Sequence, residues 1–260
     1  MNRIALLLLC LAPAALPQEK TMTCNDGDHW GDSAHFCEIR ETTVVAAGQL
    51  NVDGGQNGGI SVKGANRADI LVRAKVQTSG NDDADARGLA SQVQIEAAGA
   101  RVRAVGPSTS GRRGWSVSFE IFVPNKTGLE LQAHNGGISI SDVQGRVSFT
   151  TVNGGVSLRR LAGTVEGHTT NGGVHLELAS DHWEGDRCDV ATTNGGVTIQ
   201  IPSNYSAHLE TSTVNGGMRV DFPVTVQGEV NRHLAVDLGS GGNLIRATTT
   251  NGGITVERSM

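Results

Sequence analysis

Apolar and polar residues alternate along the chain around a repeated Asn-Gly-Gly triplet. The triplet occurs seven times, beginning at Asn57, Asn135, Asn153, Asn171, Asn194, Asn215 and Asn251. Apolar residues stand three and five positions after each asparagine, as at Val156 and Leu158, and a polar residue such as Ser157 stands between them. This period of two predicts a strand with one buried and one exposed face after each triplet.

The residues before each triplet predict a second strand. From Asn135 onward the triplets are separated by 18, 18, 23, 21 and 36 residues. Core positions recur six residues before the asparagine, at Leu129, Val147, Val165, Cys188, Leu209 and Ile245. Threonines recur two residues before it, at Thr151, Thr169, Thr192, Thr213 and Thr249, where we expect them to pack and to hydrogen-bond the turn backbone. Gly145 and Gly163 mark a second corner in each repeat.

Two architectures fit this pattern. Asn-Gly between alternating strands is a strong signal for a two-residue hairpin turn, which would give an antiparallel meander. A meander does not require the same residue type at every aligned position, whereas stacked coils place equivalent residues in columns. The sequence therefore favours an all-β fold, a parallel β-solenoid (β-helix) with coils of about 18–23 residues. Its structural turns begin at Asn135, Asn153, Asn171, Asn194, Asn215 and Asn251.

The solenoid model assigns a role to each residue of the triplet. We expect the glycines to permit positive φ at a tight corner. We expect the asparagines to stack into a hydrogen-bonded amide ladder. The interval of 36 residues before Asn251 contains either an insertion or one degenerate coil.

The chain before the repeats is less regular. Strands are expected at Glu38–Ala46, Ile70–Gln77 and Trp115–Val123. One short helix is expected after Asn81, which we assign as its N-cap because two aspartates follow it. The apolar face of this helix comprises Ala86, Leu89, Ala90 and Val93. Such a region would cover the first coil, whose exposed strand edges otherwise invite association.

The first residues indicate export. A short apolar run over residues 4–11 precedes small residues, as in a signal peptide, and no later run has the roughly 20 apolar residues of a transmembrane helix. Acylation at Cys10 is disfavoured because the bulky Leu9 precedes it. The predicted organisation is a signal peptide at 1–18, an irregular β-rich cap at 19–126 and the repeats at 127–260, with cap and repeats forming one continuous domain.

Composition and charge narrow the class of partner. The chain has 35 glycines and only 3% aromatic residues, so its core is built from small side chains. Its net charge is -5, and its lysines and arginines are scattered, which argues against binding to nucleic acid. We expect a protein that is secreted, periplasmic or associated with the cell envelope.

The cysteines fit an oxidising compartment. Cys24 and Cys37 are predicted to form a disulfide, which would contribute about 3 kcal/mol by restricting the unfolded chain. Cys188 is predicted to be an inert buried thiol. Candidate metal ligands lie between these two cysteines, at Asp26, Asp28, His29, Asp32 and His35. We favour a polar loop closed by a disulfide over a metal site.

One exposed column carries the best candidate binding chemistry. It lies five residues before each asparagine, at Glu130, Ser148, Glu166, Asp189, Glu210 and Arg246. Glu166, Asp189 and Glu210 fall in successive coils, about 4.8 Å apart per step, and would offer a site for Ca²⁺ or a basic partner. We favour a solvated acidic face instead, and predict neither a metal site nor a cofactor.

No catalytic residues are predicted. His168 and His175 fall on outward positions of different strands, and the repeat places no nucleophile beside a histidine and an acid. A polysaccharide-active β-helix enzyme is the alternative, but it would need a pair of carboxylates. Three tryptophans either contact glycans or fill gaps in the core, namely Trp30, Trp115 and Trp183.

The repeated units also resemble a known family. The relevant segments are Thr151–Leu158, Thr169–Leu176, Thr192–Ile199 and Thr249–Val256, the entry at Cys37–Glu41, the strand from Trp115 to Pro124 and the late Gly-Ser-Gly-Gly corner. They are similar to the bacterial putative-adhesin family of β-strand-repeat proteins, a domain of unknown function. The resemblance covers nearly all of the chain after the signal peptide. It implies an exported β-solenoid, suggests adhesion and supplies no catalytic residues.

We therefore expect a non-enzymatic protein, an adhesin or another surface-binding or structural envelope protein. Its partner would be a cell-surface glycan or a protein. A component of envelope stress signalling that binds a protein through a flat sheet face is a further alternative, because flat repeat surfaces serve both roles.

Overall fold

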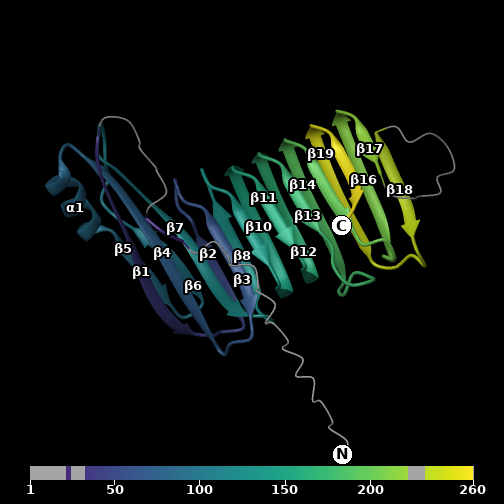
Figure 1. Cartoon of the computed structure of the whole chain (residues 1–260), viewed down its shortest axis with the longest axis horizontal. Coiled ribbons are helices and arrows are strands. Elements are labelled where there is room, and N and C mark those ends of the chain that lie inside the picture. The colour runs from purple at the N-terminus through teal and green to yellow at the C-terminus, as the bar shows by residue number, and fades with distance from the viewer. Residues whose placement is uncertain (1–21, 25–32, 222–231, 260) are drawn as a thin grey trace, which may run out of the picture.

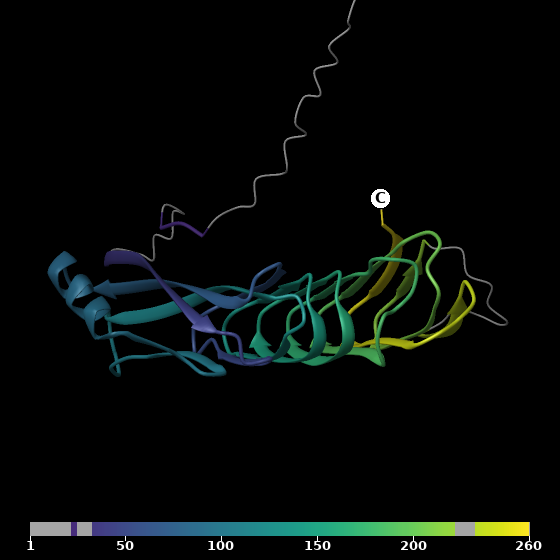
Figure 2. The same cartoon turned by 90° about the horizontal axis from the view of Figure 1, so that it is seen from below.

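The computed structural model describes residues 22–24, 33–221 and 232–259 (Figure 1). Within these residues the chain forms two sheets of ten strands each and one helix. The expectation of an all-β chain with one short helix is thus confirmed. Along the repeats the two sheets lie face to face as two layers (Figure 2). The predicted signal peptide at 1–18 lies outside the described residues.

In each sheet the ten strands follow one another in a continuous hydrogen-bonded order, from one edge to the other. The first sheet contains β1 (Ala34–Val45), β4 (Asp69–Gly80), β7 (Gly114–Pro124), β3 (Ile60–Ala65), β9 (Ile138–Ser141), β11 (Val156–Arg159), β13 (Val174–Glu177), β15 (Val197–Ile201), β20 (Ile254–Arg258) and β17 (Met218–Val220). The second sheet contains β18 (His233–Leu238), β16 (Ala207–Asn215), β19 (Leu244–Asn251), β14 (Arg187–Asn194), β12 (Ala162–Asn171), β10 (Gln144–Asn153), β8 (Gly128–Ala133), β2 (Gln49–Asp53), β6 (Arg101–Val105) and β5 (Gln94–Ala98).

The strands of the repeats pair in parallel, in the register that the triplets define. The strand before each triplet lies in the second sheet and the strand after it lies in the first. Asn153 pairs with Asn171, and Asn171 pairs with Asn194. The antiparallel meander is therefore wrong for these strands. The triplet at Asn57 joins the same stack, because β2 pairs with β8 and β3 pairs with β9 in parallel. The boundary between cap and repeats at residues 126 and 127 stays a prediction.

The asparagines form the expected amide ladder along one corner. Each Nδ2 donates to the Oδ1 of its neighbour at 2.7–3.0 Å. The order along the ladder is Asn57, Asn135, Asn153, Asn171, Asn194, Asn251 and Asn215. The threonine column is buried beside the ladder. Each of its hydroxyls donates to the first glycine carbonyl of an adjacent triplet, as Thr151 does to Gly136 at 2.8 Å. From Asn135 onward, neighbouring triplets are therefore joined by both the asparagine ladder and a threonine hydrogen bond.

The glycines of the triplets were expected to permit positive φ, and this expectation was wrong. None of them has φ in the left-handed region. The first glycine is required by close packing instead, because a Cβ on Gly154 would lie 2.1 Å from the carbonyl oxygen of Gly136. The other first glycines of the stack from Gly136 onward meet the same limit, at 1.9–2.1 Å. At the second corner Gly163 does have φ of +103°, and its Cβ would also clash with Gly145.

The last repeat departs from chain order. Strand β19 lies between β14 and β16, and β20 lies between β15 and β17. The chain first forms β16 and β17, and then β18, which pairs antiparallel with β16 at the edge of the second sheet. It then returns to form β19 between β14 and β16, and β20 between β15 and β17. In its described part, the long interval before Asn251 therefore holds an inserted edge strand and not a stacked coil.

The core fills the space between the two layers. The predicted apolar columns are buried, apart from the partly exposed Met218 and Val220 at the edge strand β17. Cys188 is fully buried within its column, as predicted. Phe149 is accommodated because its neighbour in β12 is Gly167, where a Cβ would lie 2.4 Å from the ring. The absence of a side chain at Gly167 thus makes room for the ring of Phe149.

The amino-terminal end is closed by β1, β4 and β7, which pair antiparallel. They match the three strands predicted there, and each begins earlier than expected. Helix α1 (Asp83–Gln92) buries Ala86, Leu89 and Ala90, with Val93 buried just beyond it, which confirms the predicted face. The predicted N-cap was wrong. Asp82 caps the helix, because its carboxylate accepts from the Asp85 backbone at 2.8 Å, whereas Asn81 bonds the side chain of Asp85.

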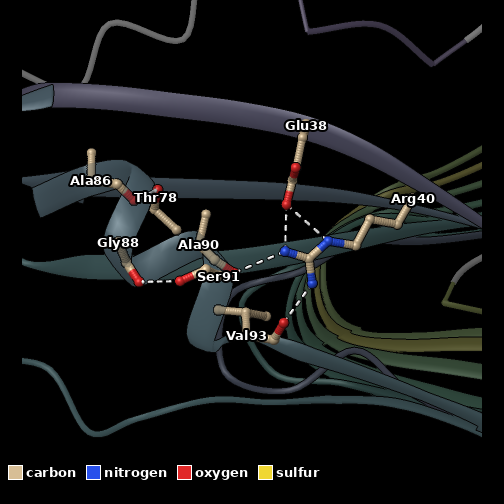
Figure 3. A network of polar contacts seen from close by, with 8 residues as sticks. All are labelled: Glu38, Arg40, Thr78, Ala86, Gly88, Ala90, Ser91 and Val93. Carbon is tan, nitrogen blue, oxygen red and sulfur yellow. Dashed lines mark hydrogen bonds and ion pairs between the residues drawn. The ribbon is translucent and has the colours of Figure 1, made fainter. Parts of the chain in front are cut away.

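Arg40 of β1 fixes the carboxyl end of this helix (Figure 3). Its guanidinium donates to the carbonyl oxygen of Ala90 in the last turn and to that of the C-cap residue Val93. Glu38 pairs with the same guanidinium at 2.8 Å from Nε. Thr78 of β4 donates to the carbonyl oxygen of Ala86 at 2.8 Å. The helix is thus bonded to two strands of the first sheet.

Candidate binding surface on the stacked repeats

A groove of about 740 Å³ runs along the outer face of the first sheet. We call it the glycine groove. It crosses β7, β3, β9, β11, β13 and β15 in their spatial order. Its lining includes the second glycine of five triplets, Gly59, Gly137, Gly155, Gly173 and Gly196. Six strands with five spacings of about 4.8 Å make it about 24 Å long.

The second glycines form a floor without side chains. Gly137, Gly155, Gly173 and Gly196 are exposed, whereas the first glycine of each of these triplets is partly buried. A Cβ on Gly155 would meet its nearest atom at 3.6 Å, an ordinary contact. On Gly173 and Gly196 the nearest atom would be at 3.3 Å, a tight contact that a small shift relieves. Packing therefore demands glycine at the first position of the triplet far more than at the second.

Short polar side chains stand beside this floor. They come from the outward position of each strand and comprise Ser118, Ser61, Ser139, Ser157, His175 and Thr198. Ser61, Ser139, Ser157, His175 and Thr198 follow one another in register across the parallel strands. The groove therefore presents backbone and methylene carbon along its floor, and hydroxyl groups and the imidazole of His175 along its side. Such a surface suits an extended ligand that lies along the stack.

The outer face of the second sheet differs from its expected form. We expected Glu166, Asp189 and Glu210 to form an acidic column in chain order. Because β19 is inserted, Arg246 lies between the last two, at 3.6 Å from Asp189 and 2.8 Å from Glu210. Arg187 pairs with Glu166. Glu166 and Asp189 remain direct partners on neighbouring strands, whereas Arg246 separates Asp189 from Glu210, so the three carboxylates do not form one cluster.

Titration behaviour on this face follows from the same pairs. A hydrogen bond from Arg246 holds the pKa of Glu210 below its usual range. The carboxylate of Asp237 in β18 accepts from His208 Nδ1 at 2.7 Å and raises the pKa of His208. The charged network therefore continues from β14 through β19 and β16 to β18.

The remaining candidate residues are dispersed. Cys24 and Cys37 form the predicted disulfide, with their Cα atoms 5.7 Å apart. Burial raises the pKa of the Cys188 thiol, which makes a thiolate unfavourable there. His168 and His175 belong to different sheets. Of the proposed loop ligands only His35 lies within the described residues, in β1.

The three tryptophans do not share one environment. Trp183 is buried and donates to the carbonyl of Gly163 at 3.1 Å, so it fills the core. Trp115 is partly buried and donates to Pro107 at 2.9 Å. Trp30 lies outside the described residues. Sequence reasoning did not find the glycine groove, although the repetition of the second glycine was a signal for it.

The fold and its surfaces define a repeat protein of stacked parallel strands with an Asn-Gly-Gly corner. The chain belongs to the Toastrack DUF4097 family, whose model matches residues 56–257. This confirms the resemblance to a putative-adhesin family of unknown function. No curated protein matches the chain. Among the described residues, no helix has the length and apolar character needed to cross a membrane.

Three solved structures are similar to this chain at low identity. A putative cell adhesion protein from Clostridium sporogenes is 12% identical with a TM-score of 0.44, and the match covers 86% of this chain and all of that one (100%). A putative adhesin from Bacteroides fragilis is 11% identical with a TM-score of 0.45, covering 86% and 97%. A putative lipid binding protein from Parabacteroides distasonis is 12% identical with a TM-score of 0.37, covering 86% and 97%.

Proposed function

We propose that this protein is an exported, non-enzymatic β-solenoid that binds a cell-surface or envelope partner through the glycine groove. Export is supported by the apolar run and small residues at the start of the sequence. The solenoid is supported by parallel register in both sheets and by the alternation of corners along each repeat. The names of the solved structures above carry no part of the argument, because their TM-scores are low.

The second glycine of the triplet carries the proposal. Gly155 has room for a methyl group and an ordinary φ, so neither packing nor backbone conformation explains a glycine there. A bare floor does explain it, because any side chain at this position would fill the groove. The first glycine, by contrast, is explained by the neighbouring backbone alone.

The charged residues on the outer face of the second sheet support a binding function over an enzymatic one. General acid and base chemistry on a sugar needs two carboxylates that face one bond. Glu166 is paired with Arg187, and Glu210 is paired with Arg246. Each carboxylate is thus directed to an arginine and not to a second acid. The buried Cys188 thiol is equally unsuited to act as a nucleophile.

A pair of outward tyrosine substitutions tests the groove. Ser139→Tyr places a ring in the groove, and Thr248→Tyr places the same ring on the outer face of the second sheet. We expect Ser139→Tyr to lower binding of the labelled protein to bacterial surfaces and glycan arrays at least tenfold. Thr248→Tyr should bind like the wild type. Equal binding by the two variants would contradict the proposal, as would turnover of a polysaccharide by the purified protein.

A second pair separates binding from stability. Gly155→Ala should weaken surface binding with little change in melting temperature, because its Cβ has ordinary contacts. Gly154→Ala should lower the melting temperature strongly, because its Cβ would lie 2.1 Å from a carbonyl oxygen. If Gly155→Ala binds as the wild type does, the bare floor has no role in recognition.

A further inference from the structure

A residue from near the start of the chain lies at the glycine groove. Met22 lines it together with the strands of the first sheet, although it lies in no strand. Met22 is partly buried, and the segment 22–24 runs along the outer side of this sheet (Figure 2). A partly buried apolar side chain that lines the groove from outside the strands indicates a docked contact.

The disulfide explains how this segment reaches the groove. Cys37 pairs with Gln77 of β4, and Gln77 pairs with Ser116 of β7, two residues from Ser118 at the end of the groove. Two strand spacings separate β1 from β7, or about 10 Å. From Cys24 the two residues back to Met22 span about 7 Å when extended. The Cys24–Cys37 bond therefore places Met22 within reach of the groove.

Methionine also fits the surface that it contacts. Its side chain is unbranched and flexible, so it adapts to a shallow surface of irregular shape. The floor at Gly59 and Gly137 offers backbone carbon, and Ser61 and Ser139 offer hydroxyl groups at the side. Backbone groups of an extended peptide can bond such hydroxyls while an apolar side chain covers the floor.

We infer that Met22 is a tethered self-ligand and that the groove takes an extended peptide segment of a partner protein carrying an unbranched apolar side chain. The inference deepens the proposed function and rests on it. The strap, residues 22–24, competes with the partner for the β7–β3 end of the groove. The disulfide strengthens this competition because it keeps Met22 at a high local concentration.

A synthetic peptide with the sequence of residues 19–24, with serine in place of the cysteine, is the probe. Its binding is measured by fluorescence anisotropy with the full-length protein, the Cys24→Ser/Cys37→Ser variant and Met22→Gly. We expect both variants to bind the peptide at least tenfold more tightly than the wild type. A peptide with glycine in place of methionine should not bind, and Ser139→Tyr added to Met22→Gly should abolish binding.

Two of the variants show whether a change in peptide binding comes from unfolding of the protein. Met22→Gly retains the disulfide, and Thr248→Tyr added to it serves as the matched control that should bind normally. Equal affinity for wild type and variants, or no binding to any of them, would overturn the strap. So would variants that bind an oligosaccharide or an alkyl chain but not the peptide. If Ser139→Tyr still blocks surface binding in those cases, the proposed function stands and only the strap fails.

Discussion

The central repeats and the last repeat use the same contacts in a different order. From β8 to β14 the order of strands in the second sheet is the order of the chain. At the carboxyl end β19 separates β14 from β16, although Asn194, Asn215 and Asn251 occupy equivalent corners. Backbone pairing, the amide ladder and the threonine bond do not distinguish the two orders, because every repeat offers them.

Charge does distinguish them. In chain order Glu210 would stand beside Asp189, and two like charges on paired strands repel. In the observed order Arg246 lies between them and contacts both. The shared columns therefore specify stacking, while the contacts of Arg246 with Asp189 and Glu210 favour the observed position of the last repeat.

The largest effect should come from the corner glycine of the inserted repeat. In Gly252→Ala the new Cβ would lie 2.0 Å from the carbonyl oxygen of Gly195, so the stack must open. We expect a loss of about 3 kcal/mol in the free energy of unfolding, measured by urea denaturation. Gly253→Ala is the control, because its Cβ would meet Gly217 at 3.4 Å and should cost less than about 1 kcal/mol. Equal losses would show that close approach does not require the first glycine.

Reversing the charge of the inserted repeat should have a moderate effect. Arg246→Glu places a third acid between Asp189 and Glu210, and we expect a loss of about 1 kcal/mol because all three groups are partly exposed. The loss should shrink in high salt. Adding Glu210→Arg should recover part of it by restoring one opposite pair. A loss unaffected by salt and by the second substitution would contradict the electrostatic account.

The threonine hydrogen bonds should stabilise the ordered repeats and the inserted repeat equally. Thr192 donates to Gly172 at 2.7 Å within the ordered repeats, and Thr249 donates to Gly195 at 2.8 Å in the inserted one. Thr192→Val and Thr249→Val should each cost about 1 kcal/mol in thermal unfolding, since each leaves a carbonyl without its partner. Markedly different losses would mean that the inserted repeat is held by other contacts.

The smallest effect should be that of pH at the edge strand. Asp237 raises the pKa of His208 in the folded protein. The pair therefore stabilises the fold fully below the unfolded pKa of about 6.5, and this contribution is lost as pH rises through the folded pKa. His208→Gln should lower the melting temperature slightly at pH 5 and not at pH 9. A difference that grows with pH has the wrong sign for this pair.

Much of the fold could be predicted because the repeats carry local signals. The alternation at Val156 and Leu158 and the position of Thr151 define faces and columns without any knowledge of topology. The order of the last repeats could not be predicted in this way, since Asn194, Asn215 and Asn251 look alike to a local pattern. The order of the acidic column was mispredicted for that reason, because the insertion places Arg246 between Asp189 and Glu210 and not after Glu210.

The binding surface was less accessible to prediction. Both glycines of a triplet look identical in sequence, and only the neighbouring backbone shows that Gly154 is needed for packing while Gly155 is not. Met22 gave no signal either, because its contact with the groove depends on where the disulfide places it. Positive φ was expected for the glycines of the triplets, but at the first glycine of each triplet stacking and not conformation excludes a side chain.

Disulfide trapping of neighbouring strands tests the inserted order most directly. Thr198 of β15 pairs with Thr255 of β20, and Arg219 of β17 pairs with the other side of Thr255. Adjacent strands bring Cα atoms into the range of a disulfide, while a strand two places away, at about 10 Å, is too far. The account predicts that Thr198→Cys crosslinks with Thr255→Cys and not with Arg219→Cys, as mapped by mass spectrometry of the oxidised protein. A crosslink between positions 198 and 219 in its place would show that the repeats stack in chain order.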